Sequence, residues 1–150
     1  MNKRFWVEVR ISYDGAAESG ENIHMTETWL VRAATFAEAE ARTVEAVSEY
    51  ENVCNVDVET CTKRNIAGVW VGTTEEGPCK WYKVRCETIT TNEKTGKEKR
   101  IKRDYLIWAP NMLEAYGTLF KCLADDYGID NIEVLGINLT SITEILSDHE

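Results

Sequence analysis

Trp81, Lys83 and Arg85 occupy every second position of the stretch WYKVRC, residues 81 to 86. Residues two apart in a β-strand point to the same side of the sheet, so we expect these three side chains to share one face. Proteins that bind single-stranded nucleic acid combine flat rings with cations, because bases stack on the rings while the cations contact phosphates. The stretch therefore indicates a binding surface for single-stranded nucleic acid.

A similar stretch, WVEVRI, occurs at residues 6 to 11 and places Trp6 and Arg10 in the same arrangement. It has Glu8 where the second stretch has Lys83. A carboxylate repels phosphate, so the second stretch is favoured as the binding face.

The charge of the chain is unevenly distributed. Residues 80 to 103 hold nine Lys or Arg against three acids, a charge of +6, whereas the whole chain of 150 residues carries −9. Such an acidic chain is not expected to bind nucleic acid or anionic membrane indiscriminately, so the basic segment TGKEKRIKR, residues 95 to 103, stands out as a local track. The candidate residues for nucleic acid or partner binding are Trp6, Arg10, Trp81, Lys83, Arg85, Lys97, Lys99, Arg100, Lys102, Arg103 and Trp108.

The same residues also have a purely structural interpretation. A Trp at a strand start often covers the open end of a core, and a Lys-rich hairpin often protects a sheet edge against aggregation. Leu30, Leu106 and Trp108 fall on the expected outer face, which indicates that part of this face is buried. Three binding hypotheses stay open: single-stranded nucleic acid, a host protein or a second copy of the chain, and a small molecule held between two halves of the chain.

Nothing in the sequence indicates catalysis, a metal or a cofactor. The five cysteines form no CxxC pair, and the two histidines, His24 and His149, lie far from every cysteine that they could activate. Signatures of hydrolases, phosphate-binding loops and zinc proteases are absent from the sequence. We therefore expect a non-enzymatic binding protein, either for nucleic acid or as a protein-interaction module such as a defence-system inhibitor.

An internal repeat explains why the two stretches resemble each other. Trp6 and Arg10 match Trp81 and Arg85 at an offset of 75, and after one extra residue the offset becomes 76, as for Leu30 and Leu106. The repeat predicts a first unit over 1–66, a linker over 67–79 and a second unit over 80–150, together forming one compact domain.

Each repeat is expected to fold as strand, strand, helix, strand. Alternating apolar residues predict the first strands, and Asp14-Gly15 or Thr95-Gly96 predict hairpin turns between antiparallel strands. Thr35 and Asn111 each precede a Glu by three residues, which marks a helix start, and the helices are expected to end at Asn52 and Gly128. The fold class is therefore α+β, with antiparallel sheets and one packed helix per unit.

The repeat also assigns three cysteines to structural positions. Cys86 takes the place of Ile11, Cys61 that of Ile137 and Cys122 that of Ala46. A buried Cys behaves as a small hydrophobic residue, so these thiols are expected to be reduced core residues.

The stretch WLVRAATFAEAEAR, residues 29 to 42, together with KWYKV and the GKEK hairpin, resembles the family known as domain of unknown function 4494. The resemblance covers almost the whole chain and implies the duplicated fold. It also implies a bacterial setting among Bacteroidales, their phages and mobile elements, and it brings no catalytic residues. The N-terminal residues lack the apolar run of a signal peptide and no later run is long enough to span a membrane, so a cytoplasmic protein is expected.

Overall fold

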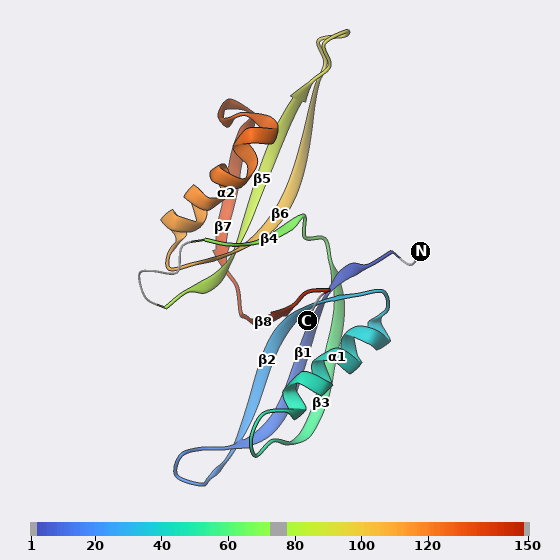
Figure 1. Cartoon of the computed structure of the whole chain (residues 1–150), viewed down its shortest axis with the longest axis vertical. Helices are drawn as coiled ribbons and strands as arrows, with labels where there is room; N and C mark the ends of the chain where they lie inside the picture. The colour runs from blue at the N-terminus through green and yellow to red at the C-terminus, as the bar shows by residue number, and fades with distance from the viewer. Residues whose placement is uncertain (1–2, 73–77, 149–150) are drawn as a thin grey trace. The chain divides into compact units, whose positions relative to one another are not determined.

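The computed structural model describes residues 3–72 and 78–148. Within them the chain forms eight strands, two α-helices and one short 3-10 helix (Figure 1). The elements are β1 (Phe5–Ala16), β2 (Asn22–Ala33), α1 (Phe36–Ser48), β3 (Cys54–Arg64), β4 (Gly68–Val71), β5 (Lys80–Thr91), β6 (Glu98–Ala109), α2 (Met112–Tyr127), η1 (Ile129–Asn131), β7 (Ile132–Leu139) and β8 (Ile142–Leu146). The predicted α+β class is confirmed.

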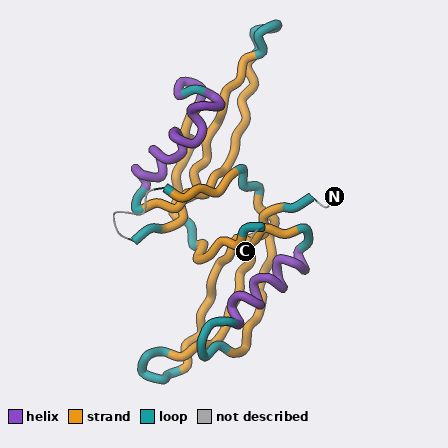
Figure 2. Tube along the Cα trace, viewed as in Figure 1, coloured by secondary structure: helices purple, strands orange, loops and turns teal. Residues whose placement is uncertain are grey.

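The chain divides into two compact units. The first unit comprises residues 1–64 and 141–150, and its sheet has the strand order β3-β1-β2-β8. The second unit comprises residues 65–140, and its sheet has the order β4-β6-β5-β7. Each sheet is covered by one helix, and Figure 2 shows this pairing of helix and strands.

Alternation along β1 builds the core of the first unit. Val7, Val9 and Ile11 are fully buried on the side of the sheet that α1 covers, and the helix adds Ala39 and Val47 to the same cluster. The polar residues between them point to the other side, as the period of two requires. The candidate residues of β1, Trp6 and Arg10, therefore lie on the face of the sheet that the helix does not cover, which we call the helix-free face.

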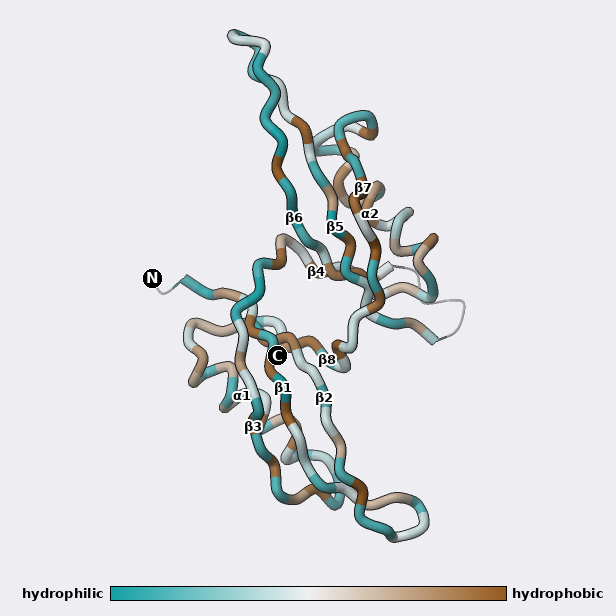
Figure 3. The backbone as a smooth tube through the Cα atoms, turned by 180° about the vertical axis from the view of Figure 1, so that it is seen from behind, coloured by the Kyte–Doolittle hydropathy of each residue, from teal (hydrophilic) through white to brown (hydrophobic). Residues whose placement is uncertain are grey.

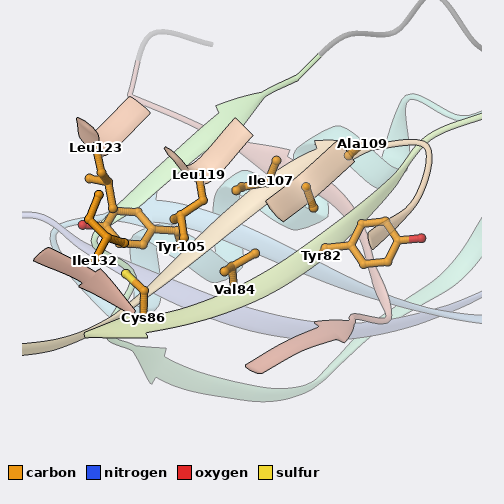
Figure 4. Close-up of a cluster of buried hydrophobic side chains, with 10 residues drawn as sticks. Tyr82, Val84, Cys86, Tyr105, Ile107, Ala109, Leu119, Leu123 and Ile132 are labelled. Carbon is orange, nitrogen blue, oxygen red and sulfur yellow. The ribbon is translucent and has the colours of Figure 1, made fainter. Parts of the chain in front are cut away.

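The second unit repeats this arrangement with larger residues. Val84 and Ile107 of the sheet pack with Leu119 and Leu123 of α2, and Tyr105 completes the centre of the cluster (Figure 4). Leu119 occupies the position that Thr43 holds in the first repeat. Thr43 is also fully buried, and its hydroxyl donates to the Ala39 carbonyl at 2.8 Å, which satisfies the polar group.

Both predicted helix starts are confirmed. The Thr35 hydroxyl accepts from the Glu38 amide at 3.0 Å, and the Asn111 side chain accepts from the Glu114 amide at 2.9 Å. The second helix ends at Gly128 with φ of 81°, as expected. The first helix ends earlier than expected, at Ser48, and Asn52 instead takes its left-handed φ of 59° in the turn that follows.

The hydrogen bonds of Glu38 at the start of α1 make the stability of the fold depend on pH. The Glu38 carboxylate accepts from the Ala34 amide at 2.7 Å and from Arg4 at 3.0 Å, and these two bonds lower its pKa. A group with a lowered pKa stabilises the fold above its unfolded pKa of about 4.3 and loses this contribution as the pH falls. We expect Glu38→Gln to destabilise the protein at pH 7 but much less at about pH 3. Urea unfolding of both proteins at the two pH values measures this, and an equal difference at both would contradict it.

The fourth strand of each sheet was not expected from the sequence, and it comes from the other repeat. β8 lies at the end of the second repeat but pairs with β2, placing Ile145 beside Leu30. β4 follows the first repeat but pairs with β6, placing Val69 beside Leu106. Val69 and Ile145 are themselves 76 residues apart, the offset of the repeat, so the two strands are exchanged reciprocally.

This exchange corrects three expectations. The sheets are mixed and not antiparallel, because β8 and β4 run parallel to their neighbours. The expected linker over 67–79 contains β4, and its residues 73–77 lie outside the described residues. The compact units also differ from the expected boundaries of 1–66 and 80–150, since residues 141–150 belong to the first unit. A parallel edge strand can be supplied by a segment far away in the sequence, before or after its partner, and spacing alone does not say which.

The β5–β6 hairpin continues past the end of α2 as a two-stranded arm (Figure 1). Its strand β6 is coloured hydrophilic over most of the outer part in Figure 3. At the tip, the Asn92 side chain accepts from the amides of Lys94 and Thr95, and Gly96 takes a φ of 70°. The turn predicted at Thr95-Gly96 is therefore confirmed.

Candidate nucleic-acid interface

Two of the tryptophans of the second unit, Trp81 and Trp108, lie opposite each other on the helix-free face. Trp81 of β5 pairs with Trp108 of β6, and their ring centroids are 5.1 Å apart with planes inclined by 51°. Both residues are half-buried. Each ring therefore packs on the other, and only part of each remains to contact a base.

Leucines on the helix-free faces are buried. Leu30 and Leu106 are each 1% exposed although they belong to neither helix-covered cluster. The expectation that part of the outer face is buried is confirmed at these two positions. Leu106 is the cross-strand neighbour of Lys83, so the candidate face is interrupted between the tryptophans and the arm.

The arginines of this face are held by carboxylates. Arg85 donates to its cross-strand neighbour Asp104 at 3.1 Å. Arg100 pairs with Glu87 at 3.0 Å and with Glu98 at 3.5 Å, and the hydrogen bond to Glu87 raises its pKa. These two arginines would have to exchange a protein partner for a phosphate in order to bind nucleic acid.

Four lysines have no such partner. Within residues 3–72 and 78–148 no ion pair involves Lys83, Lys97, Lys99 or Lys102, and the last three are exposed. Lys102 points to the helix-free side of β6, while Lys97 and Lys99 alternate to the other side. The arm therefore carries available positive charge on both of its faces.

Arg103 lies apart from the other candidates. Its guanidinium donates to the Thr88 hydroxyl at 2.7 Å and sits 5.7 Å from the ring centroid of Tyr127. Both contacts lie on the side of the sheet that α2 covers, where Tyr127 ends the helix. This position gives Arg103 a structural contact with the helix.

A recess of about 280 Å³ lies where β4 leaves the outer edge of β6. The Ala67 amide donates to the Asp104 carbonyl at 2.8 Å, and both residues line the recess. The recess is polar and is lined by Asn65, Ala67, Arg85, Ile101, Lys102, Arg103 and Asp104. Of its three cations, Arg85 bonds to the Asp104 carboxylate and Arg103 to the Thr88 hydroxyl, so Lys102, which has no ion pair among the described residues, is the cation that suits an anionic group such as a phosphate.

A second, shallow hollow lies at the hairpin tip. It has a volume of about 600 Å³ and is lined by Thr90, Thr91, Asn92, Thr95, Lys97, Glu98 and Lys99. Sequence reasoning singled out the lysines of these two hollows. It missed Asn65 and Ala67, because the pairing of β4 with β6 had no signal in the sequence.

On the equivalent face of the first unit, the tryptophan and the arginines already interact with other side chains of that face. The Arg32 guanidinium lies over the Trp6 ring at 5.3 Å, Arg10 pairs with Glu59 at 3.4 Å, and Arg64 pairs with Glu8 at 2.8 Å. Trp6 and Arg10 belong to the first unit, whereas the other candidates belong to the second unit. The structure therefore brings together the candidates of the second unit alone.

Burial raises the pKa of three of the thiols. Burial raises the pKa of Cys86, which is fully buried in the second core as predicted, and burial also raises the pKa of Cys61. Cys122 was expected in the core, but it is exposed because it lies on the outer side of α2. A raised pKa keeps a thiol protonated and a weak nucleophile.

Two tyrosines with a raised pKa, Tyr13 and Tyr50, contact Glu27 in the first unit. The Glu27 carboxylate accepts from Tyr13 at 2.9 Å, from Trp29 at 3.0 Å and from Tyr50 at 3.4 Å. Burial, followed by Glu27, raises the pKa of Tyr13 to about 12. The described residues contain no group of three or more His, Cys, Asp or Glu placed to hold a metal ion. They also contain no helix long and apolar enough to cross a membrane.

These features define an α+β protein of two mixed four-stranded sheets, each covered by one helix, with a basic hairpin arm on the second sheet. The chain belongs to the family described as Domain of unknown function (DUF4494), whose model matches residues 5–148. A comparison with curated proteins gave no match. The family match spans both units and assigns no activity.

Proposed function

We propose that this protein binds single-stranded nucleic acid through the β5–β6 arm. The observation that carries the proposal is the set of unpaired lysines, Lys97, Lys99 and Lys102, exposed on an arm of a chain whose net charge is −9. Local cations attract phosphates, while the acidic remainder of the chain limits binding elsewhere on its surface.

The recess supports the same function. A phosphate bound by Lys102 in this recess would continue the track of the arm toward Lys83. The exposed part of the Trp81 and Trp108 pair then offers a ring for one base at the end of this track. Stacking of that kind contributes about 1–3 kcal/mol per base and depends little on sequence.

The family resemblance supports a setting for this activity. We propose that the protein acts in the cytoplasm of a Bacteroidales bacterium and is encoded by a phage or mobile element, where single-stranded intermediates of replication and transfer occur. We propose binding without an enzymatic step, and each of the residues described above has a role in binding.

A charge-reversal variant tests the proposal. Lys97→Glu/Lys99→Glu/Lys102→Glu should bind a labelled single-stranded oligonucleotide about 100-fold more weakly than the wild type, because three phosphate contacts contribute about 1 kcal/mol each in water. The matched control is Lys3→Glu/Lys80→Glu/Lys121→Glu, which changes the net charge equally outside the arm. Fluorescence anisotropy at low salt measures both affinities. Equal losses in the two variants, or no binding by the wild type, would contradict the proposal.

A protein-interaction module, such as a host-factor or defence-system inhibitor, is the second candidate function. It is favoured by exposed apolar residues near the start of α2, where Met112, Leu113 and Tyr116 are 49%, 77% and 43% exposed. Surface patches of this kind often mark protein contacts. If this function holds, Leu113→Asp should prevent recovery of a stoichiometric partner from a cognate lysate, while the lysine variant should not.

A further inference from the structure

We propose that the arm also binds a second copy of this chain, through the acidic hairpin that the first repeat places at the equivalent position. The basic arm is defined as residues 89–103 and the acidic arm as residues 14–27, the β1–β2 hairpin. The basic arm holds six Lys or Arg and two Glu, a charge of +4, whereas the acidic arm holds four acids and no Lys or Arg, a charge of −4. Two hairpins of one fold thus carry opposite charges of equal size.

The backbone of both arms is open along one edge. β8 pairs with β2 only from Thr28 onward, so in the described part of the chain the outer edge of residues 22–27 has no strand partner. β4 pairs with β6 only from Tyr105 onward, and the outer edge of residues 98–103 is likewise without a described strand partner. Open edges bind other strands through backbone hydrogen bonds. Both arms therefore have an edge at which a further strand can pair.

The side chains of the two edges are also complementary. Ile23 and Met25 of the acidic arm are each 40% exposed. On the basic arm, Ile101 alternates with Arg100 and Lys102 along β6. Pairing of the two strands would cover these apolar side chains while it brings Lys or Arg close to Glu18 and Glu21, which are exposed and form no ion pair in residues 3–72 and 78–148.

Nucleic acid and the acidic arm of a second copy compete for the same lysines of the basic arm. Lys99 and Lys102 contact phosphate in one state and the acidic arm of another copy in the other. Nucleic acid should therefore dissociate the self-association of the protein. The pairing itself does not rest on nucleic-acid binding, because its charges and edges are all within the chain.

Three variants test the pairing by sedimentation equilibrium of nuclease-treated protein. The wild type should rise above its monomer mass of 17.1 kDa at low salt and return to it near 1 M salt, where charges are screened beyond about 3 Å. Lys97→Glu/Lys99→Glu/Lys102→Glu should remain monomeric, and so should Glu18→Lys/Ser19→Lys/Glu21→Lys. The two sets combined in one chain exchange the signs of the arms and should restore association.

The outcomes separate this inference from the proposed function. Restored association in the combined chain supports the pairing, and a wild type that stays monomeric at low salt overturns it. Association that survives either single reversal also overturns it. For nucleic acid the expectation differs, since the acidic-arm variant should bind oligonucleotide at least as well as the wild type. Failure of one proposal therefore leaves the other measurable.

Discussion

A chain that ends at Thr140 will fail to hold its first unit folded, although only residues from the end of the second repeat are removed. The truncation deletes β8, which supplies the fourth strand of the first sheet. It also removes Leu146 from the first core, the Ser147 carbonyl that accepts from Arg42 at 2.7 Å, and Asp148, which binds Arg4. Three half-buried aliphatic side chains, Ile142, Ile145 and Leu146, and these polar contacts together contribute on the order of 3–5 kcal/mol.

That loss is a large part of the stability of a small domain, about 5–15 kcal/mol. The second unit should be unaffected, because Thr140 stays in place and its amide and hydroxyl still bond to the Trp81 carbonyl. Amide hydrogen exchange resolves the two units: protection should fall at Val7 and Val31 and persist at Val84 and Ile107. A chain that ends at Leu146 keeps β8 and is the control. Equal loss of protection in both units would contradict the exchanged strand.

Leu119→Ala is expected to have the largest effect of any single truncation in the second core. Leu119 is 0% exposed and lies in the cluster with Val84, Tyr105 and Ile107 (Figure 4). Removing it deletes buried methyl groups and leaves a cavity, which costs about 2–5 kcal/mol. Leu113→Ala in the same helix is the matched control, since Leu113 is 77% exposed and its truncation should change stability by about 0.5 kcal/mol or less.

Denaturant unfolding followed by helical circular dichroism measures both variants. The two units need not unfold together, so the midpoint of the transition should be assigned by the loss of amide protection in α2. A small effect of Leu119→Ala, similar to that of the control, would mean that α2 is not packed through this position.

Local patterns predicted the local structure of this chain. The period of two in β1 and β5 and the capping residues Thr35 and Asn111 correctly marked strands and helix starts, because these signals arise from neighbours in sequence. The fourth strands escaped prediction for the opposite reason. GVWV of β4 is four residues long, and its partner is a strand more than 30 positions away in the other repeat.

The candidate site was predicted in composition but not in arrangement. Sequence spacing correctly placed Trp81 and Trp108 on one face, but it did not show that they pack on each other. It also could not distinguish paired cations such as Arg85 from unpaired ones such as Lys99, because an ion pair depends on the residue across the strand. Cross-strand register, which follows from the whole sheet, decides which charges are available.

The salt dependence of binding tests the proposed nucleic-acid arm most directly. Each lysine that contacts phosphate on a single strand adds about 0.7 to the slope of log affinity against log salt concentration. Removing the charge in Lys97→Ala/Lys99→Ala/Lys102→Ala should therefore lower the wild-type slope by about 2, whereas Lys3→Ala/Lys80→Ala/Lys121→Ala should leave it unchanged. Equal slopes for the wild type and the arm variant would contradict the account, because phosphate would then be bound elsewhere.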